Sequence, residues 1–392
     1  MSLLKRYPKA YFEILASSFM LMINMSLVSA FLPIFAYELD PSGVMVGLVS
    51  SVWFFSRVFL EIPSGVLSDI VGRRFLLVLG LAASTIGATL CSLANNIYVL
   101  IAGRALWGLG TGLFFMNSSA IIFDIFHSGR GTALGTFQSI EFIGSFIGAP
   151  IGSFMASMMG YRKVFMVSAM LGATSLIIAY LSGELRRVDA RCAKGFRGGG
   201  NLLSLRKVLP GLRNIRLTSV YIGSFSRMFV WTGISGTVFP LFLNLRSNIP
   251  VEIIGIITSV RTLGIIVSTA VSGRLSDKLG RKPVIAAGML TEALSLYAYI
   301  HAPASSLIIS TISFVEGVGR GMVLTSLMAL LSDLAPQSLR GSAIGVYRTF
   351  MDAGGLTGPI FAMMVYEAFG PTAPFLSAAV VVLVTSALIM AA

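Results

Sequence analysis

Charged side chains occur deep inside several long apolar segments of this sequence. Ionisable groups within a membrane are costly to keep and by default mark functional sites. At about 1.5 Å per helical residue, a position roughly ten to fourteen residues into a spanning helix lies near the middle of the bilayer. Acids at that depth can exchange protons, and arginines can pair with acids or with an anionic ligand. The side chains at this depth are Arg57, Glu141, Arg227, Arg261, Glu292, Glu316, Arg320 and Asp352.

Two pairs of opposite charges have the spacing of neighbours on one helix face. Arg57 with Glu61, and Arg348 with Asp352, are each four residues apart. Each pair has two interpretations, a functional site or a self-neutralising structural pair. For Arg57 and Glu61 the structural interpretation is at least as good as the functional one.

The composition excludes an ordinary water-soluble domain, because 55% of the residues are apolar and only 11% are charged. The net charge of +13 does not indicate a nucleic-acid partner, since the basic residues occupy short gaps between apolar runs. Cys91 and Cys192 have neither disulfide nor metal-ligand spacing. The HExxH, G-x-S-x-G and G-x-x-x-x-G-K-[ST] motifs are absent from the sequence. We therefore expect a membrane protein that is not an enzyme and has no metal or cofactor.

Twelve apolar runs are long enough to cross a bilayer as helices, since a crossing needs about 20 residues. The basic residues outside the membrane lie almost all at the N-terminus and in the loops after even-numbered runs. This bias predicts that both termini are cytoplasmic. The expected spans are 10–37, 43–68, 75–94, 97–124, 131–159, 162–182, 215–244, 251–275, 283–302, 304–332, 341–368 and 371–391.

The longest gap between spans is rich in Arg, Lys and Gly (RRVDARCAKGFRGGGN) and cannot bury enough apolar surface to fold alone. It predicts a cytoplasmic linker, 184–214, between an N-terminal bundle, 1–183, and a C-terminal bundle, 215–392. Its charge is explained by the positive-inside bias, and attraction to anionic lipid headgroups is the alternative.

Internal repeats connect these two bundles. The segment GVLSDIVGRR at 65–74 returns as GRLSDKLGRKP at 273–283, an offset of 208 residues (65 to 273). RGTALGTFQS from Arg130 returns as RGSAIGVYRT from Arg340, and WGLGTG from Trp107 aligns with EGVGRG from Glu316. Repeats at nearly one offset predict two six-helix halves with the same orientation, a parallel repeat.

The repeated loop G-x-L-x-D-x-x-G-R-[RK] resembles the signature of the major facilitator superfamily. The resemblance covers the whole chain. It implies an all-α polytopic fold of 12 transmembrane helices in two parallel-repeat six-helix bundles. It also implies transport by alternating access, a place in the cytoplasmic (plasma) membrane and a functional monomer.

In this family the signature loop is understood as a conformational latch on the cytoplasmic side. We expect its glycines to allow close helix approach and its aspartates to accept hydrogen bonds from arginines. The alternative, in which the arginines only set topology, does not explain an Asp at the same place in both halves. The residues that match the latch are Gly65, Asp69, Arg73, Arg74, Asp124, Arg130, Gly273, Asp277, Arg281, Lys282, Asp333 and Arg340.

The resemblance also implies that spans 1, 4, 7 and 10 line a central cavity. Glu316 is the first candidate for proton exchange, with Arg320 one turn away to modulate it, and Glu141 is the second. Arg104 lies where the family often has an arginine linked to proton coupling. The expected cavity residues are Asn24, Arg104, Trp107, Asn117, Arg227, Trp231, Glu316 and Arg320.

The fifth span reads GSFIGAPIGS, which resembles the kink motif of drug/proton antiporters but departs from it at Ala149 and Ser153. We expect GGLTGP in the eleventh span to be its counterpart in the other half, and each motif is either a hinge or a packing device. The function predicted from these features is proton-coupled efflux of small hydrophobic or cationic compounds. The alternatives are a facilitator or proton symporter for a polar or anionic metabolite, and a non-transport membrane enzyme or scaffold.

Overall fold

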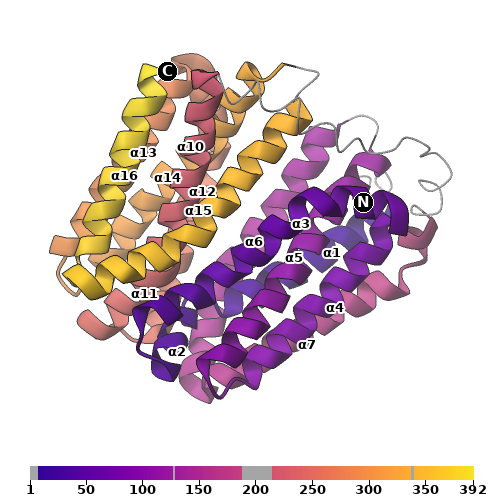
Figure 1. Cartoon of the computed structure of the whole chain (residues 1–392), viewed down its shortest axis with the longest axis horizontal. Coiled ribbons are helices and arrows are strands. Elements are labelled where there is room, and N and C mark those ends of the chain that lie inside the picture. Colours follow the sequence, from indigo (N-terminus) through magenta and orange to yellow (C-terminus); the bar gives the residue numbers. More distant parts are fainter. Residues whose placement is uncertain (1–7, 127–128, 188–213, 337–339) are drawn as a thin grey trace. The chain divides into compact units, whose positions relative to one another are not determined.

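The computed structural model describes residues 8–126, 129–187, 214–336 and 340–392, apart from the side chains at 59, 61–66, 69–70, 130 and 340–342. The described chain is helical almost throughout (Figure 1). Its residues form two compact units, and α3 (Gly43–Val71) passes from one to the other. The all-α fold class is confirmed.

The first unit contains Met1–Ser29 and Phe55–Gly200. Within it α1 packs along α6 and α7, and α4 packs along α5 and α7. Its helices, besides the second part of α3, are α1 (Lys9–Leu27), α4 (Arg73–Ser92), α5 (Ile97–Ile125), α6 (Arg130–Met159) and α7 (Tyr161–Leu181).

The second unit contains Ala30–Phe54 and Asn201–Ala392. Its helix α14 packs against both α12 and α13, and α10 packs along α15. Its segments, besides the first turns of α3, are α2 (Leu32–Leu39), α10 (Ile215–Val230), the π-helix η2 (Trp231–Val238), α11 (Phe239–Leu241), the π-helix η3 (Phe242–Arg246), α12 (Val251–Leu279), α13 (Arg281–His301), α14 (Ser306–Leu334), α15 (Arg340–Phe369) and α16 (Ala373–Ala391).

Most predicted spans match these helices to within a few residues, and two differ. The expected span 10–37 is broken between Leu27 and Leu32, because Pro33 lies in the first turn of α2 and has no N–H to continue a helix from α1. The expected span 215–244 is continuous but changes from α- to π-helix at Trp231. Among the described residues, 10 helical segments are long and apolar enough to cross a membrane.

Glycines set close helix contacts in both units. A Cβ atom on Gly152 of α6 would overlap the carbonyl of Leu27 in α1. In the second unit, a Cβ on Gly354 or Gly358 of α15 would overlap the backbone of α10. The Gly- and Pro-containing motifs of spans 5 and 11 are therefore packing devices in this structure, as small residues are in membrane bundles generally.

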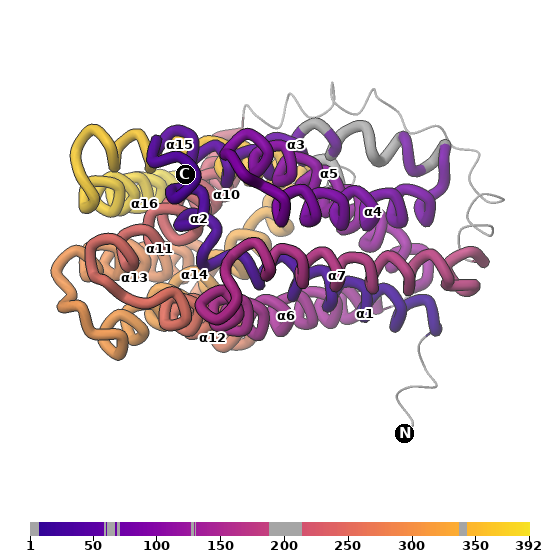
Figure 2. Tube along the Cα trace, turned by 90° about the horizontal axis from the view of Figure 1, so that it is seen from below, coloured from indigo at the N-terminus to yellow at the C-terminus, as the bar shows by residue number. Residues whose placement is uncertain are grey.

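The segment Ala30–Phe54 packs with the second unit, although the repeats assign it to the first half. Figure 2 shows the short helix α2 beside α11. The backbone N–H of Gly43 donates to the carboxylate of Glu367, and the hydroxyls of Thr237 and Ser50 share a hydrogen bond of 3.0 Å. The predicted linker lies mostly outside the described residues, so the division at 184–214 stays a prediction.

Candidate functional site

Four of the charges selected by depth meet inside the second unit. Arg261 comes from α12, Glu292 from α13, and Glu316 and Arg320 from α14. Each is at most 3% exposed, and Glu316 is 0% exposed. We call these four side chains the charge cluster. Its formal charges cancel, as buried ions require when each costs several kcal/mol to desolvate.

Glu316 lies at the centre of the charge cluster. Its Oε1 accepts a hydrogen bond from Ser235 Oγ at 2.9 Å and lies 2.8 Å from Arg320 Nη2. Its Oε2 accepts one from the Tyr299 hydroxyl at 2.6 Å and lies 3.0 Å from Arg261 Nε. Two cations and two hydroxyls thus surround one carboxylate.

Glu292 is held far less closely. Its Oε1 lies 2.9 Å from Arg320 Nη2, the same nitrogen that contacts Glu316. Despite this distance, the geometry gives Glu292 Oε1 no hydrogen bond within the described part of the chain. The two buried carboxylates contact the same guanidinium nitrogen, but only Glu316 also has Arg261, Ser235 and Tyr299 as partners.

Aromatic rings cover the outer faces of both arginines. Arg320 Cζ lies 4.7 Å from the centre of the Trp231 ring, and Arg261 Cζ lies 4.4 Å from that of Phe239. Such cation–π contacts are worth about 2 kcal/mol when desolvated. They allow a guanidinium to stay charged where water does not reach it.

The π-helix η2 places Trp231 and Ser235 at the charge cluster. Pro240 has no N–H to bond the carbonyl four residues earlier, so a regular α-helical ladder cannot continue through this segment. The Thr237 hydroxyl instead donates to the carbonyl of Thr232, five residues earlier, at 2.8 Å. Wide turns of this kind often occur at functional sites.

The sequence did not indicate Tyr299, Ser235 or Phe239 as part of the site. A usable signal was present, because Tyr299 follows Glu292 by two helical turns and Ser235 follows Trp231 by one. Tyr299 also shares a hydrogen bond of 2.7 Å with Ser313. Reading the i+7 neighbour of Glu292 would have found Tyr299, and reading the i+4 neighbour of Trp231 would have found Ser235.

The remaining second-unit candidates lie outside the charge cluster. Arg227 Nη2 lies 3.2 Å from Met351 Sδ, and Arg227 is close enough to act electrostatically on Glu292. Asp352 is fully buried in α15, and Arg348 is half-buried one turn earlier. Arg227 is thus a positive charge outside the charge cluster that still acts on Glu292.

Candidates in the first unit make mainly structural contacts. The amide of Asn24 donates to the Ser168 carbonyl at 2.5 Å, and the Ser168 hydroxyl returns a bond of 2.8 Å to the Asn24 carbonyl. This exchange joins α1 to α7. Asn117 donates to the carbonyl of Leu113 on its own helix at 2.8 Å. Both asparagine amides are thus engaged in contacts within the first unit.

Charged candidates of the first unit are spread over several helices. Arg104 Cζ lies 5.4 Å from the centre of the buried Trp107 ring. Glu141 Oε1 accepts a hydrogen bond from the Ser18 hydroxyl at 3.5 Å. Arg57 packs beside α5, where a Cβ on Gly112 would be 3.2 Å from its Cγ. The Glu61 side chain lies outside the described residues.

The signature loop of the second half contains a compact ionic network. Arg281 Nη1 lies 2.5 Å from Asp277, and its Nε donates to Asp333 at 3.0 Å. Nη1 also donates to Ser276 Oγ at 2.7 Å. Lys282 follows Arg281 at the start of α13. Arg281 thereby connects the start of α13 to the end of α12, where Ser276 and Asp277 lie, and to the end of α14, where Asp333 lies.

The first half repeats the central contact of this network. Arg73 pairs with Asp124 at the end of α5 and donates to the Ala120 carbonyl at 3.1 Å. Arg74 Nη2 donates to the Tyr180 carbonyl of α7 at 2.7 Å. In both halves, the arginine that begins the helix after the signature loop pairs with an aspartate at the end of the next helix. The latch residues whose side chains lie outside the described residues are Gly65, Asp69, Arg130 and Arg340.

The expected role of Gly273 is wrong. A Cβ on Gly273 would meet only Thr325 Cγ2, at 3.9 Å, which is ordinary contact. Helix α12 does not approach another helix unusually closely there. Close approach in this helix occurs instead at Gly264, where a Cβ would overlap the backbone of α14.

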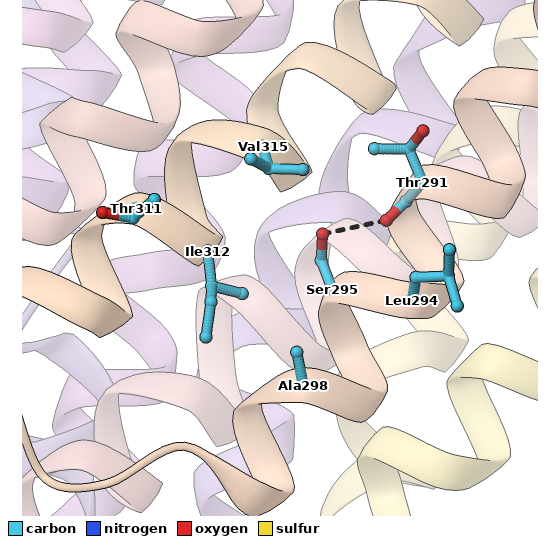
Figure 3. A pocket seen from close by; sticks show the side chains of 7 residues that line it. All are labelled: Thr291, Leu294, Ser295, Ala298, Thr311, Ile312 and Val315. Carbon is cyan, nitrogen blue, oxygen red and sulfur yellow. Dashed lines mark hydrogen bonds between the residues drawn. The ribbon is translucent and has the colours of Figure 1, made fainter.

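A separate pocket of about 400 Å³ lies between α13 and α14 (Figure 3). The Ser295 hydroxyl donates to the Thr291 carbonyl at 2.8 Å, and the Thr291 and Thr311 hydroxyls also donate within their own helices. Leu294 and Val315 are exposed, so the pocket opens on the surface of the unit. Its lining carries no charge and is therefore not the site of proton chemistry. The lining residues are Thr291, Leu294, Ser295, Ala298, Thr311, Ile312 and Val315.

Comparison with known proteins identifies relatives over nearly the whole chain. A family model described as Major Facilitator Superfamily matches residues 14–247 and 220–392. The multidrug resistance protein MdtG of Klebsiella pneumoniae (strain 342) is 29% identical over 371 residues, which cover 91% of this chain and 87% of that protein. MdtG of Escherichia coli (strain K12 / DH10B) is 27% identical over 369 residues, covering 91% and 88%.

Solved structures share the fold at lower identity. A point mutant of the nucleoside transporter NupG has a TM-score of 0.81 at 14% identity, covering 97% of this chain and 99% of that one. A POT family transporter in complex with 5-aminolevulinic acid has a TM-score of 0.76 at 15% identity, covering 98% and 96%. At such identity these likenesses concern the fold alone.

Proposed function

Because the chain belongs to the Major Facilitator Superfamily and is a transporter, not an enzyme, we propose that it exports small hydrophobic or cationic compounds in exchange for protons. Family membership confirms the resemblance found in the sequence. The efflux direction is supported by relatives that are named multidrug resistance proteins. Alternating access, with both termini cytoplasmic and a functional monomer, completes the proposal.

The observation that carries the proton coupling is the charge cluster. Two carboxylates are buried with two arginines among α12, α13, α14 and η2. Uptake of one proton changes the cluster from neutral to a formal charge of +1 in a region of low dielectric. An unpaired buried charge costs several kcal/mol, which is enough to change the relative stability of two conformations.

The latch proposal rests on the paired ionic contacts of the two signature loops. In each half the contact joins an arginine to an aspartate on a helix one hairpin away, Arg73 to Asp124 and Arg281 to Asp333. Both second-half partners are partly exposed, so the contact between Arg281 and Asp333 is weak, about 0.2–1 kcal/mol. Contacts of this strength can break and reform during a transport cycle.

A second candidate function is symport or facilitated transport of a small anionic or polar metabolite. The observation that favours it is an excess of buried arginine donors. Among the described residues, Arg320 Nε and Nη1, Arg261 Nη2 and Arg227 Nε lack a hydrogen-bond acceptor. A carboxylate or phosphate could take up several of these donors at once.

The test is proton flux across liposomes that contain the purified protein and a pH-sensitive dye. Lipophilic cations, sugars and organic anions are added one at a time. Proton release triggered by lipophilic cations supports the proposed exporter. Uptake of an organic anion, with or without proton movement, supports the second candidate and excludes the first.

A further inference from the structure

We infer that Glu292, and not Glu316, is the carboxyl group that takes up and releases the transported proton, and that Arg320 is the positioning residue that responds. This inference rests on the proposed proton-coupled function and assigns its chemistry within the charge cluster. It replaces the expectation from sequence, in which Glu316 exchanged the proton.

Glu316 is surrounded in a way that keeps it ionised. It lies within 3.0 Å of both arginines and accepts hydrogen bonds from Ser235 and Tyr299. Contacts of this kind favour the charged form of a carboxylate. A proton on Glu316 would leave two guanidinium groups without their shared counter-ion.

Glu292 faces a different set of charges. From α14 it faces Arg320 at 2.9 Å and the carboxylate of Glu316; from α12 and α10 it faces the more distant Arg261 and Arg227. Helix α16, which also packs on α13, contains no charged residue. A proton on Glu292 would remove one ion pair, and Arg320 would keep its contact with Glu316.

The contacts of Arg320 explain how these two carboxylates are coupled. Its Nη2 lies 2.8 Å from Ser235 Oγ, 2.8 Å from Glu316 Oε1 and 2.9 Å from Glu292 Oε1. An Nη group carries only two hydrogens, so three oxygens compete for two donors. The hydrogen bond from Nη2 goes to Ser235, and Ser235 in turn donates to Glu316 Oε1, whereas Glu292 Oε1 has no hydrogen bond within the described part of the chain.

Protonation of Glu292 resolves this competition. Arg320 then contacts only Ser235 of η2 and Glu316 of its own helix. The ion pair between Arg320 of α14 and Glu292 of α13 is lost. Deprotonation restores the link. The proton arrives from water on one side of the membrane and leaves to the other, and no covalent bond to carbon forms or breaks. A carboxyl group on α13 can therefore change how α13 is held against α14 and η2.

The experiment compares Glu292→Gln and Glu316→Gln in liposomes with the wild-type protein and Glu252→Gln, an acid in the first turn of α12 outside the charge cluster. Two quantities are measured: substrate-triggered proton flux, and substrate exchange at equal pH on both sides, from pH 5 to 9. We expect Glu292→Gln to lose proton flux by ~100-fold, within the range for loss of a proton-transferring group. Its exchange should continue and lose its pH dependence.

A chemical measurement on the wild-type protein covers the case in which a variant fails to fold. Dicyclohexylcarbodiimide, an apolar reagent, modifies protonated carboxyl groups within membranes, and mass spectrometry locates the product. We expect modification of Glu292, increasing as the pH falls, and none of Glu316. Modification of Glu316 with Glu292 unmodified would overturn the inference.

The outcomes separate the two proposals. Coupled proton flux retained by Glu292→Gln overturns the assignment of Glu292 and leaves proton-coupled export in place. Absence of substrate-triggered proton flux in the wild-type protein overturns the proposed function and this inference together. Flux lost in Glu292→Gln and retained in Glu252→Gln, with pH-independent exchange, supports both.

Discussion

Replacement of the central carboxylate of the charge cluster should destabilise the protein more than replacement of its neighbour. Glu316→Gln removes the only carboxylate within 3.0 Å of Arg261 among the described residues, and one of two near Arg320. Removing one partner of a buried ion pair costs about 3–5 kcal/mol, because the remaining charge is left uncompensated. Glu292→Gln also leaves the charge cluster at +1, but both arginines keep their contact with Glu316, so we expect it to cost less than Glu316→Gln.

The assay is reversible unfolding in mixed micelles at a pH near 7, with the free energy of unfolding obtained from denaturant titration. Glu252→Gln serves as the matched control and should stay within about 0.5 kcal/mol of the wild-type protein. Adding Arg261→Met to Glu316→Gln restores charge balance and should recover part of the lost stability. A cost for Glu316→Gln no greater than that for Glu292→Gln would refute the unequal arrangement of the two carboxylates.

Three further predictions follow from single contacts. Gly152→Val should lower stability by about 1–3 kcal/mol, because the added atoms overlap the Leu27 carbonyl; Gly135→Val on the same helix meets open space and is the control, and equal unfolding midpoints would contradict the reasoning. Tyr299→Phe removes the hydroxyl that donates to the central carboxylate at 2.6 Å and should cost about 1–3 kcal/mol in the same unfolding assay, whereas an unchanged free energy would show that this hydrogen bond is not formed. Arg281→Ala should increase the alkylation rate of a cysteine introduced at the end of the second unit where Arg281 lies. The increase should be up to ~5-fold, because the substitution removes one exposed ion pair; an unchanged rate would argue against a latch.

Much of the fold was predictable because its signals are local. Apolar runs of span length and a repeat at one offset are each visible in a few tens of residues. The break near Pro33 was also visible in principle, but continuous hydrophobicity from Tyr11 to Tyr37 concealed it. The packing of Ala30–Phe54 with the second unit was not predictable, since it depends on contacts between segments far apart in the chain, such as Gly43 with Glu367.

The candidate site shows the same limit. Depth along a helix selected all four members of the charge cluster, because the cost of burying a charge rises with its depth in the membrane. Depth does not tell which charges meet, and the two i,i+4 pairs chosen from sequence are not part of the cluster. The different roles assigned to Glu292 and Glu316 depend on the partners that surround Glu316, which only the three-dimensional arrangement gives.

The two halves repeat their packing but not their charges. A Cβ on Gly110 would overlap the backbone of Gly80 and Ser84, and a Cβ on the repeat-related Gly319 would contact the backbone at Gly288 and Glu292. Ser84 thus occupies in the first half the place of Glu292 in the second. The same contact between hairpin helices forms with a serine or with a carboxylate, so shape does not require the charge. The second half thus has a titratable carboxylate at a position where helix packing does not require one, and this supports assigning the proton chemistry to the second half.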